Sequence, residues 1–195
     1  MIASVLQDGP LILSPDSATQ TPEIIWSAIA PNLILMLGGV LLLTVVSLVR
    51  GRLPRWFHAA WTVVVAVAAF VAIVPLWQRV QDQGASTVMA GAVGLDGFSL
   101  FVTGVICISV ALGALLLDGY LRREDLEGPE WYVLVMLSAS GGVTMASAND
   151  LIVLFVGLEI LSVAAYVLAS MHARRSSSQE AGLKYFVLGA FASPF

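Results

Sequence analysis

One acidic residue lies inside a stretch of the sequence that is otherwise apolar and uncharged. Residues 151–171 contain Glu159 near their centre and no other charged side chain. A helix of this length spans the roughly 30 Å of bilayer hydrocarbon at about 1.5 Å per residue, which places Glu159 near the midplane. A carboxylate at that depth is tolerated when it faces a bundle interior or a hydrated cavity, so it predicts an ion or proton pathway. A structural salt bridge is the alternative, although apolar residues usually stabilise a core equally well.

A basic residue in a second apolar run is the other candidate. Lys184 follows the start of an interrupted apolar stretch, residues 180–190. A lysine one turn inside the membrane can extend its four-carbon stem to the lipid headgroups, which would give it no chemical role. It can also belong to the same proton pathway as Glu159. Spacing alone leaves both interpretations open.

Three hydroxyl side chains fall on the same side of this helix as the glutamate. At 100° per residue, Ser162, Tyr166 and Ser170 lie within an arc of about 80° near Glu159. Such a stripe would suit a hydrated half-channel. Alternatively, the serines bond backbone carbonyls and the tyrosine anchors the helix near the membrane interface.

The elements that must position these residues are membrane-spanning helices. Hydrophobic residues make up 58% of the chain, charged residues only 11%, and the mean hydropathy is +0.91. Soluble domains carry about 25% charged residues. Here the charges occur in short clusters between apolar runs of spanning length, so we expect an integral membrane protein.

The pattern of apolar runs predicts an all-α, polytopic transmembrane helical bundle with five spans and a truncated sixth. Residues 1–22 lack the basic start of a signal peptide and are expected to form an extramembrane leader. A sixth span is expected to begin near Gly182, with too few residues to cross the bilayer, which suggests the amino-terminal piece of a longer protein. The five expected spans are 24–49, 57–78, 97–117, 131–148 and 151–170.

The arginines predict the orientation of the bundle. Seven of them follow the first, third and fifth expected spans, whereas Arg79 alone lies on the opposite side. Because cytoplasmic loops carry an excess of basic residues, the amino terminus is expected outside the cytoplasm. The seven are Arg50, Arg52, Arg55, Arg122, Arg123, Arg174 and Arg175.

Composition also excludes several function classes. A formal net charge of −4, with basic residues dispersed along the chain, argues against nucleic acid as a partner. One cysteine, Cys107, allows no internal disulfide and no cysteine-ligated iron–sulfur cluster held by this chain alone. His58 and His172 lack neighbours at metal-ligand spacing and are expected to supply interface polarity. The charged segment 122–130 is expected to be a solvated loop or a contact with a neighbouring subunit.

Several motifs resemble one known family. The segment Gly157-Leu-Glu159-Ile-Leu-Ser162 and the later Glu180-Ala-Gly-Leu-Lys184-Tyr-Phe resemble subunit N of bacterial NADH-quinone oxidoreductase, respiratory complex I. Asp96-Gly-Phe-Ser-Leu-Phe101 resembles that family's entry into its third helix. The resemblance extends over most of the 195 residues and is strongest from about residue 130 onward.

The resemblance implies an antiporter-like fold of inverted repeats with a midplane row of charged residues that carries protons. Residues 23–128 would then form the first three transmembrane helices and residues 129–195 the incomplete start of the proton-translocating domain. Glu159 matches the family's fifth-helix glutamate, thought to respond to a lysine on the seventh helix, and Lys184 matches its sixth-helix lysine. Quinone reduction elsewhere in the complex would change the coupling of Glu159 to a lysine and drive proton transfer.

The same resemblance assigns cofactors and partners. This chain is expected to hold no cofactor, whereas NADH, FMN, iron–sulfur clusters and quinone are expected in other subunits of the complex. Its partners would be other membrane subunits of complex I and the lipid bilayer, in the bacterial inner membrane. Two alternatives stay open: a subunit of a multi-subunit cation/proton antiporter or membrane-bound hydrogenase, and a truncated membrane scaffold that transports nothing.

Overall fold

The computed structural model describes residues 25–49, 53–172 and 175–192. It contains six helices and one β-hairpin in these ranges: α1 (Ala30–Val49), α2 (Trp56–Gln83), β1 (Ser86–Val88), β2 (Val93–Leu95), α3 (Gly97–Arg123), α4 (Glu130–Ala146), α5 (Leu151–Ser170) and α6 (Ser176–Ala192). The expected leader, residues 1–22, lies outside the described residues.

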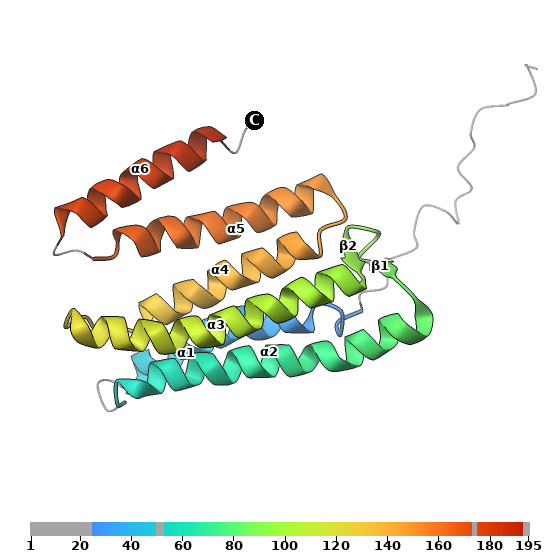
Figure 1. The fold of residues 1–195 in the computed structure, drawn as a ribbon, viewed down its shortest axis with the longest axis horizontal. Coiled ribbons are helices and arrows are strands. Elements are labelled where there is room, and N and C mark those ends of the chain that lie inside the picture. The colour runs from blue at the N-terminus through green and yellow to red at the C-terminus, as the bar shows by residue number, and fades with distance from the viewer. Residues whose placement is uncertain (1–24, 50–52, 173–174, 193–195) are drawn as a thin grey trace, which may run out of the picture.

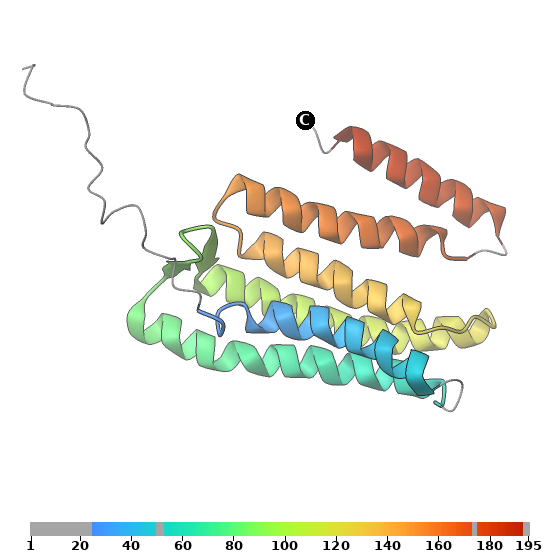
Figure 2. The same ribbon diagram turned by 180° about the vertical axis from the view of Figure 1, so that it is seen from behind.

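Helices α1 to α4 pack together, and α5 and α6 extend from them as successive outer layers (Figure 1). Helix α4 contacts α1, α3 and α5, whereas α6 packs on α5. The shared core of the first four helices contains fully buried side chains such as Leu35, Leu42 and Met136. Seen from behind, α5 and α6 again lie to one side of the remaining helices (Figure 2).

Four of the described helices, α1, α2, α3 and α5, have the length and apolar character needed to cross a membrane. The predicted multi-pass helical bundle is therefore confirmed. Helix α4 was also expected to span, but it has 17 residues and a length of about 25 Å. It is also the helix that neighbours surround most completely, because α1, α3 and α5 all pack on it.

Two helix starts differ from the expectation. Helix α1 begins at Ala30, so Pro31 lies in its first turn. The N–H that proline lacks would have no partner within the helix at this position, so no hydrogen bond is lost. Helix α6 begins at Ser176 and not near Gly182. Its first turns are polar, so the start of the apolar run did not mark the start of the helix. Helices α2 and α3 also extend beyond their apolar segments, to Gln83 and Arg123.

The antiparallel hairpin β1–β2 was not expected from the sequence. Val88 pairs with Val93, and Met89 and Ala90 adopt positive φ in the connection. The hairpin covers the α4–α5 connection: the Gly94 N–H donates to the Ser147 carbonyl at 2.8 Å, and the Asn149 side chain donates to the Gly91 carbonyl at 2.7 Å. It thereby fixes the end of the bundle from which α5 starts.

Candidate functional site

Helix α5 carries Glu159 close to its centre. Asp150 caps this helix, since its side chain accepts a 2.7 Å hydrogen bond from the Ile152 N–H. Glu159 follows nine residues later, about 13 Å along the helix. Its side chain is half-buried, and no ion pair of the described residues includes it. The carboxylate is therefore positioned deep in a spanning helix without a fixed counter-charge among these residues.

Glycines bring the backbones of α4 and α5 into contact beside this position. A Cβ atom at Gly141 would lie 2.7 Å from the Gly157 carbonyl oxygen and 2.9 Å from the Leu161 Cα. A Cβ atom at Gly157 would in turn lie 2.8 Å from the Met145 nitrogen. Glu159 lies two residues from this contact, so the close α4–α5 packing fixes its height and rotation about the helix axis.

The hydroxyl stripe does not form a lining of free polar groups. Ser162 donates to the Leu158 carbonyl, and Ser170 donates to the Val167 carbonyl at 2.9 Å. The Tyr166 ring packs edge-on against Tyr185 of α6, with ring centroids 4.7 Å apart. The structure thus favours the alternative in which the serines satisfy backbone carbonyls, while the tyrosine joins α5 to α6 instead of lying free at the interface.

The structure does not bring Lys184 to Glu159. Lys184 pairs with Glu180 on its own helix at 2.5 Å, and its side chain is 70% exposed. Gly182 packs against Ser170, and the Tyr185 ring packs against Tyr166, so α5 and α6 run antiparallel. Lys184 therefore lies near the level of Leu168, nine residues from Glu159, which corresponds to about 14 Å along the bundle.

His172, just after α5, is buried and contacts a charged residue, whereas the sequence predicted only a polar residue at the membrane interface. The His172 side chain is only 9% exposed, and its Nε2 lies 3.5 Å from an oxygen of Glu124. Arg175 donates to the same oxygen at 2.7 Å. Glu124 directly follows α3, and its contacts with His172 and Arg175 join the end of α3 to the α5–α6 connection. The expectation that it belongs to a solvated loop was therefore wrong for this residue. Nothing in the local sequence around His172 signals this contact over 48 residues of chain.

The described residues contain no group of three or more histidine, cysteine or acidic side chains that would hold a metal ion. Cys107 is a free cysteine and is buried.

Comparison with known proteins points to subunit N of NADH-quinone oxidoreductase. A family model described as "NADH:quinone oxidoreductase/Mrp antiporter, TM" matches residues 148–195. NADH-quinone oxidoreductase subunit N of Myxococcus xanthus is 37% identical over 164 residues, which cover 84% of this chain and 31% of that protein. A subunit N of Roseiflexus castenholzii is 34% identical and covers 89% and 34% of the two chains. The chain is similar to subunit N proteins over most of its length.

A solved structure agrees with the sequence match. A chain of the respiratory complex I of Thermus thermophilus, determined with bound aureothin, superposes with a TM-score of 0.66 at 29% identity. The superposition covers 84% of this chain and 34% of that one. The chain therefore spans about a third of the length of the subunit N proteins it matches. The match of the family model begins just before α5, so it contains both Glu159 and Lys184.

Proposed function

We propose that this chain forms the opening helices of a proton-translocating membrane subunit of NADH:quinone oxidoreductase, with Glu159 as the group that takes up and releases the proton. The observation that supports the proposal is the half-buried carboxylate in the middle of α5, which has no counter-charge among the described residues. Removal from water favours the protonated carboxyl, whereas an approaching cation favours the carboxylate. A cation that moves relative to Glu159 would therefore load or release a proton.

Lys184 is a separate step in this proposal. Its level on α6 is about 14 Å from Glu159, too far for a direct ion pair. The cation that acts on Glu159 would therefore come from another helix, such as the seventh-helix lysine of the family. Lys184 would transfer protons along the same row of charged residues, and its ion pair with Glu180 would break during that step.

The proposal includes the expected surroundings of the chain. Other membrane subunits of complex I would be its partners, quinone would be handled by the complex, and NADH, FMN and iron–sulfur clusters would lie in other subunits. The chain would reside in the bacterial inner membrane with its amino terminus outside the cytoplasm.

The experiment is proton pumping by the assembled complex with the full-length subunit, reconstituted in vesicles. Glu159→Gln keeps the size of the side chain and removes the proton-binding group, so we expect most of the pumping through this subunit to be lost. Glu159→Asp should retain part of it. Glu130→Gln is the matched control, because Glu130 is exposed at the start of α4. Quinone reductase activity reports assembly, and pumping that stays intact in Glu159→Gln contradicts the proposal.

A cation/proton antiporter subunit is the second candidate. The description of the matching family model names both NADH:quinone oxidoreductase and the Mrp antiporter. The same Glu159 chemistry would operate there without quinone reduction. Proton flux that requires a sodium gradient and no quinone turnover would favour this candidate.

A further inference from the structure

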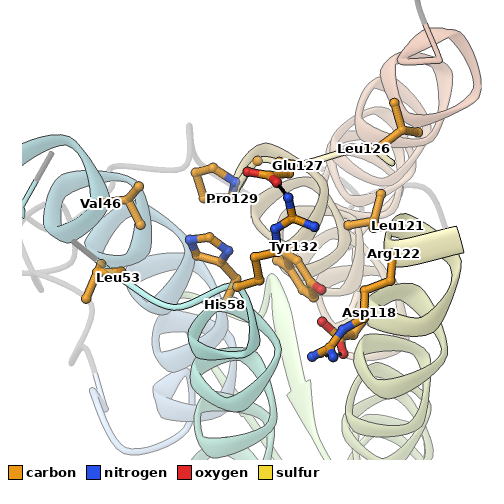
Figure 3. Close-up of a pocket in the computed structure, with 12 residues that line it drawn as sticks. Val46, Leu53, His58, Asp118, Leu121, Arg122, Leu126, Glu127, Pro129 and Tyr132 are labelled. Atoms are coloured by element: carbon orange, nitrogen blue, oxygen red, sulfur yellow. Dashed lines mark ion pairs between the residues drawn. The ribbon is translucent and has the colours of Figure 1, made fainter. Parts of the chain in front are cut away.

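A pocket lined by apolar and charged residues lies at the end of the bundle opposite the hairpin, away from Glu159. It has a volume of about 290 Å³ and is formed where α1 and α3 end and α2 and α4 begin. Figure 3 shows side chains from these elements pointing toward one another around it. Its walls combine apolar residues with His58, Tyr132 and two ion pairs.

The two ion pairs bring charges of both signs to the pocket. Arg122 pairs with Asp118 one turn earlier on α3 at 2.9 Å, and Arg55 pairs with Glu127 (Figure 3). Two cations and two anions therefore line one pocket. A ligand that carries both a positive and a negative group matches this arrangement, whereas a singly charged ligand matches half of it.

His58 adds a polar group that lacks a partner. Its Nε2 is buried and has no hydrogen-bond partner in the described part of the chain. The ring packs against Tyr132 with centroids 6.0 Å apart, which fixes its orientation. Buried polar atoms in native proteins almost always have a partner, either protein or ordered water, so this nitrogen needs a partner that the described residues do not supply.

The lengths of two spanning helices lead us to expect the pocket at the depth of the lipid headgroups. Helices α2 and α3 have 28 and 27 residues and are therefore each about 40 Å long, which exceeds the roughly 30 Å of hydrocarbon. His58 begins one of these helices, and Asp118 and Arg122 end the other. Trp56, 59% exposed, lies beside them, as is typical of the membrane interface.

We propose that this pocket binds the headgroup of a zwitterionic phospholipid with a primary amine, of the phosphatidylethanolamine type. The phosphate would accept hydrogen bonds from His58, Arg55 and Arg122, aided by the amino-terminal end of α4 at Pro129. The ammonium would donate to the carboxylates of Asp118 and Glu127. This site is independent of the proposed proton transfer, so its failure would leave that proposal untouched.

The test measures lipid retention by the full-length protein in nanodiscs of phosphatidylcholine doped with phosphatidylethanolamine or phosphatidylglycerol. Native mass spectrometry counts the retained molecules. We expect phosphatidylethanolamine to be retained about tenfold over phosphatidylglycerol, because each charge-assisted hydrogen bond is worth roughly that factor. His58→Phe keeps the aromatic packing and should lower the retention of both doped lipids, as should Arg122→Gln, because both lipids carry the phosphate. Glu127→Gln should remove the preference for phosphatidylethanolamine, because it removes a carboxylate that accepts from the amine. Arg79→Gln is the matched control, since Arg79 bonds Gln83 one turn away at the opposite end.

Three results would overturn the proposal. The first is equal retention of the two doped lipids, which would show that the pocket does not recognise the amine. The second is displacement of phosphatidylethanolamine by inorganic phosphate alone, which would show a phosphate site without lipid selectivity. The third is unchanged retention in Arg122→Gln. This side chain is 56% exposed, so its replacement tests the site even if His58→Phe fails to fold.

Discussion

Inside the helices of the bundle, hydroxyl side chains find a hydrogen-bond partner on their own helix, whereas the carboxylate of Glu159 does not. Thr62, Thr103, Ser109 and Thr144 each donate to the carbonyl four residues earlier on the same helix, at 2.7 to 2.9 Å. A hydroxyl therefore needs no neighbour. A carboxylate has no such local partner, because the helix offers it no free N–H, so Glu159 depends on water, a proton or an approaching cation.

This difference predicts the behaviour of Ser162, the hydroxyl nearest to Glu159 on the stripe. Ser162 is buried and donates to the Leu158 carbonyl, which the helix already uses. Ser162→Ala should therefore leave proton pumping by the assembled complex unchanged. A loss comparable with that of Glu159→Gln would show instead that the hydroxyl carries protons.

A second prediction concerns the cap of α5. Asp150→Ala removes the side-chain oxygen that accepts from Ile152, so we expect a loss of about 1 kcal/mol in the free energy of unfolding. Asp150→Asn keeps an accepting oxygen and should lose only a fraction of this. Denaturant unfolding in detergent micelles measures both variants, and equal losses would argue that charge, and not capping, stabilises the position.

At the scale of elements, the apolar runs were sufficient to predict α2, α3, α4 and α5, because a spanning helix needs a long apolar segment whatever surrounds it. The hairpin was missed, since strands of three residues carry no periodicity to detect. The start of α6 was missed because its polar first turns lie outside the apolar run. Helix pairing was also beyond the sequence, since which glycine meets which backbone depends on the packed bundle.

The α4–α5 contact supplies a test of how α5 is held. Gly141→Ala would place a methyl group against the Gly157 carbonyl and Leu161 of the facing backbone, which cannot move as a side chain tip can. We expect a loss of roughly 1–3 kcal/mol in the free energy of unfolding. Gly113→Ala on α3 is the control, because a Cβ atom there has no neighbour within 4 Å. Equal stabilities would contradict the close packing.

At the scale of the whole molecule, charge is gathered at one end of the bundle. Arg55, Arg122, Arg123 and Arg175 lie where α2 and α6 begin and α3 ends, whereas Arg79 lies near the far end of α2. Three of the arginines that predicted the orientation, Arg50, Arg52 and Arg174, lie outside the described residues. Within the described ranges, the arginine asymmetry read from the sequence agrees with the arrangement of the helices. The candidate residues Glu159 and Lys184 could be found from the sequence, because a charge in an apolar run is visible without a structure. The separation of about 14 Å between their levels could not be predicted, because it depends on how α6 packs on α5.

The orientation leads to a labelling prediction. Asp82→Cys and Asp125→Cys place thiols at exposed positions at opposite ends of the bundle, and the natural Cys107 is buried. A membrane-impermeant maleimide applied to intact cells should label Asp82→Cys alone, because the arginine-rich end is expected in the cytoplasm. Labelling of Asp125→Cys in intact cells would reverse the orientation.

The central claim is that Glu159 itself changes protonation during turnover. Infrared difference spectra of the assembled complex, recorded as quinone is reduced, report the C=O stretch of a carboxyl group that gains or loses a proton. We expect a carboxyl signal in the native complex that is absent in Glu159→Gln and shifted in Glu159→Asp. The same signal, unchanged in Glu159→Gln, would show that another group carries the proton and would contradict the account.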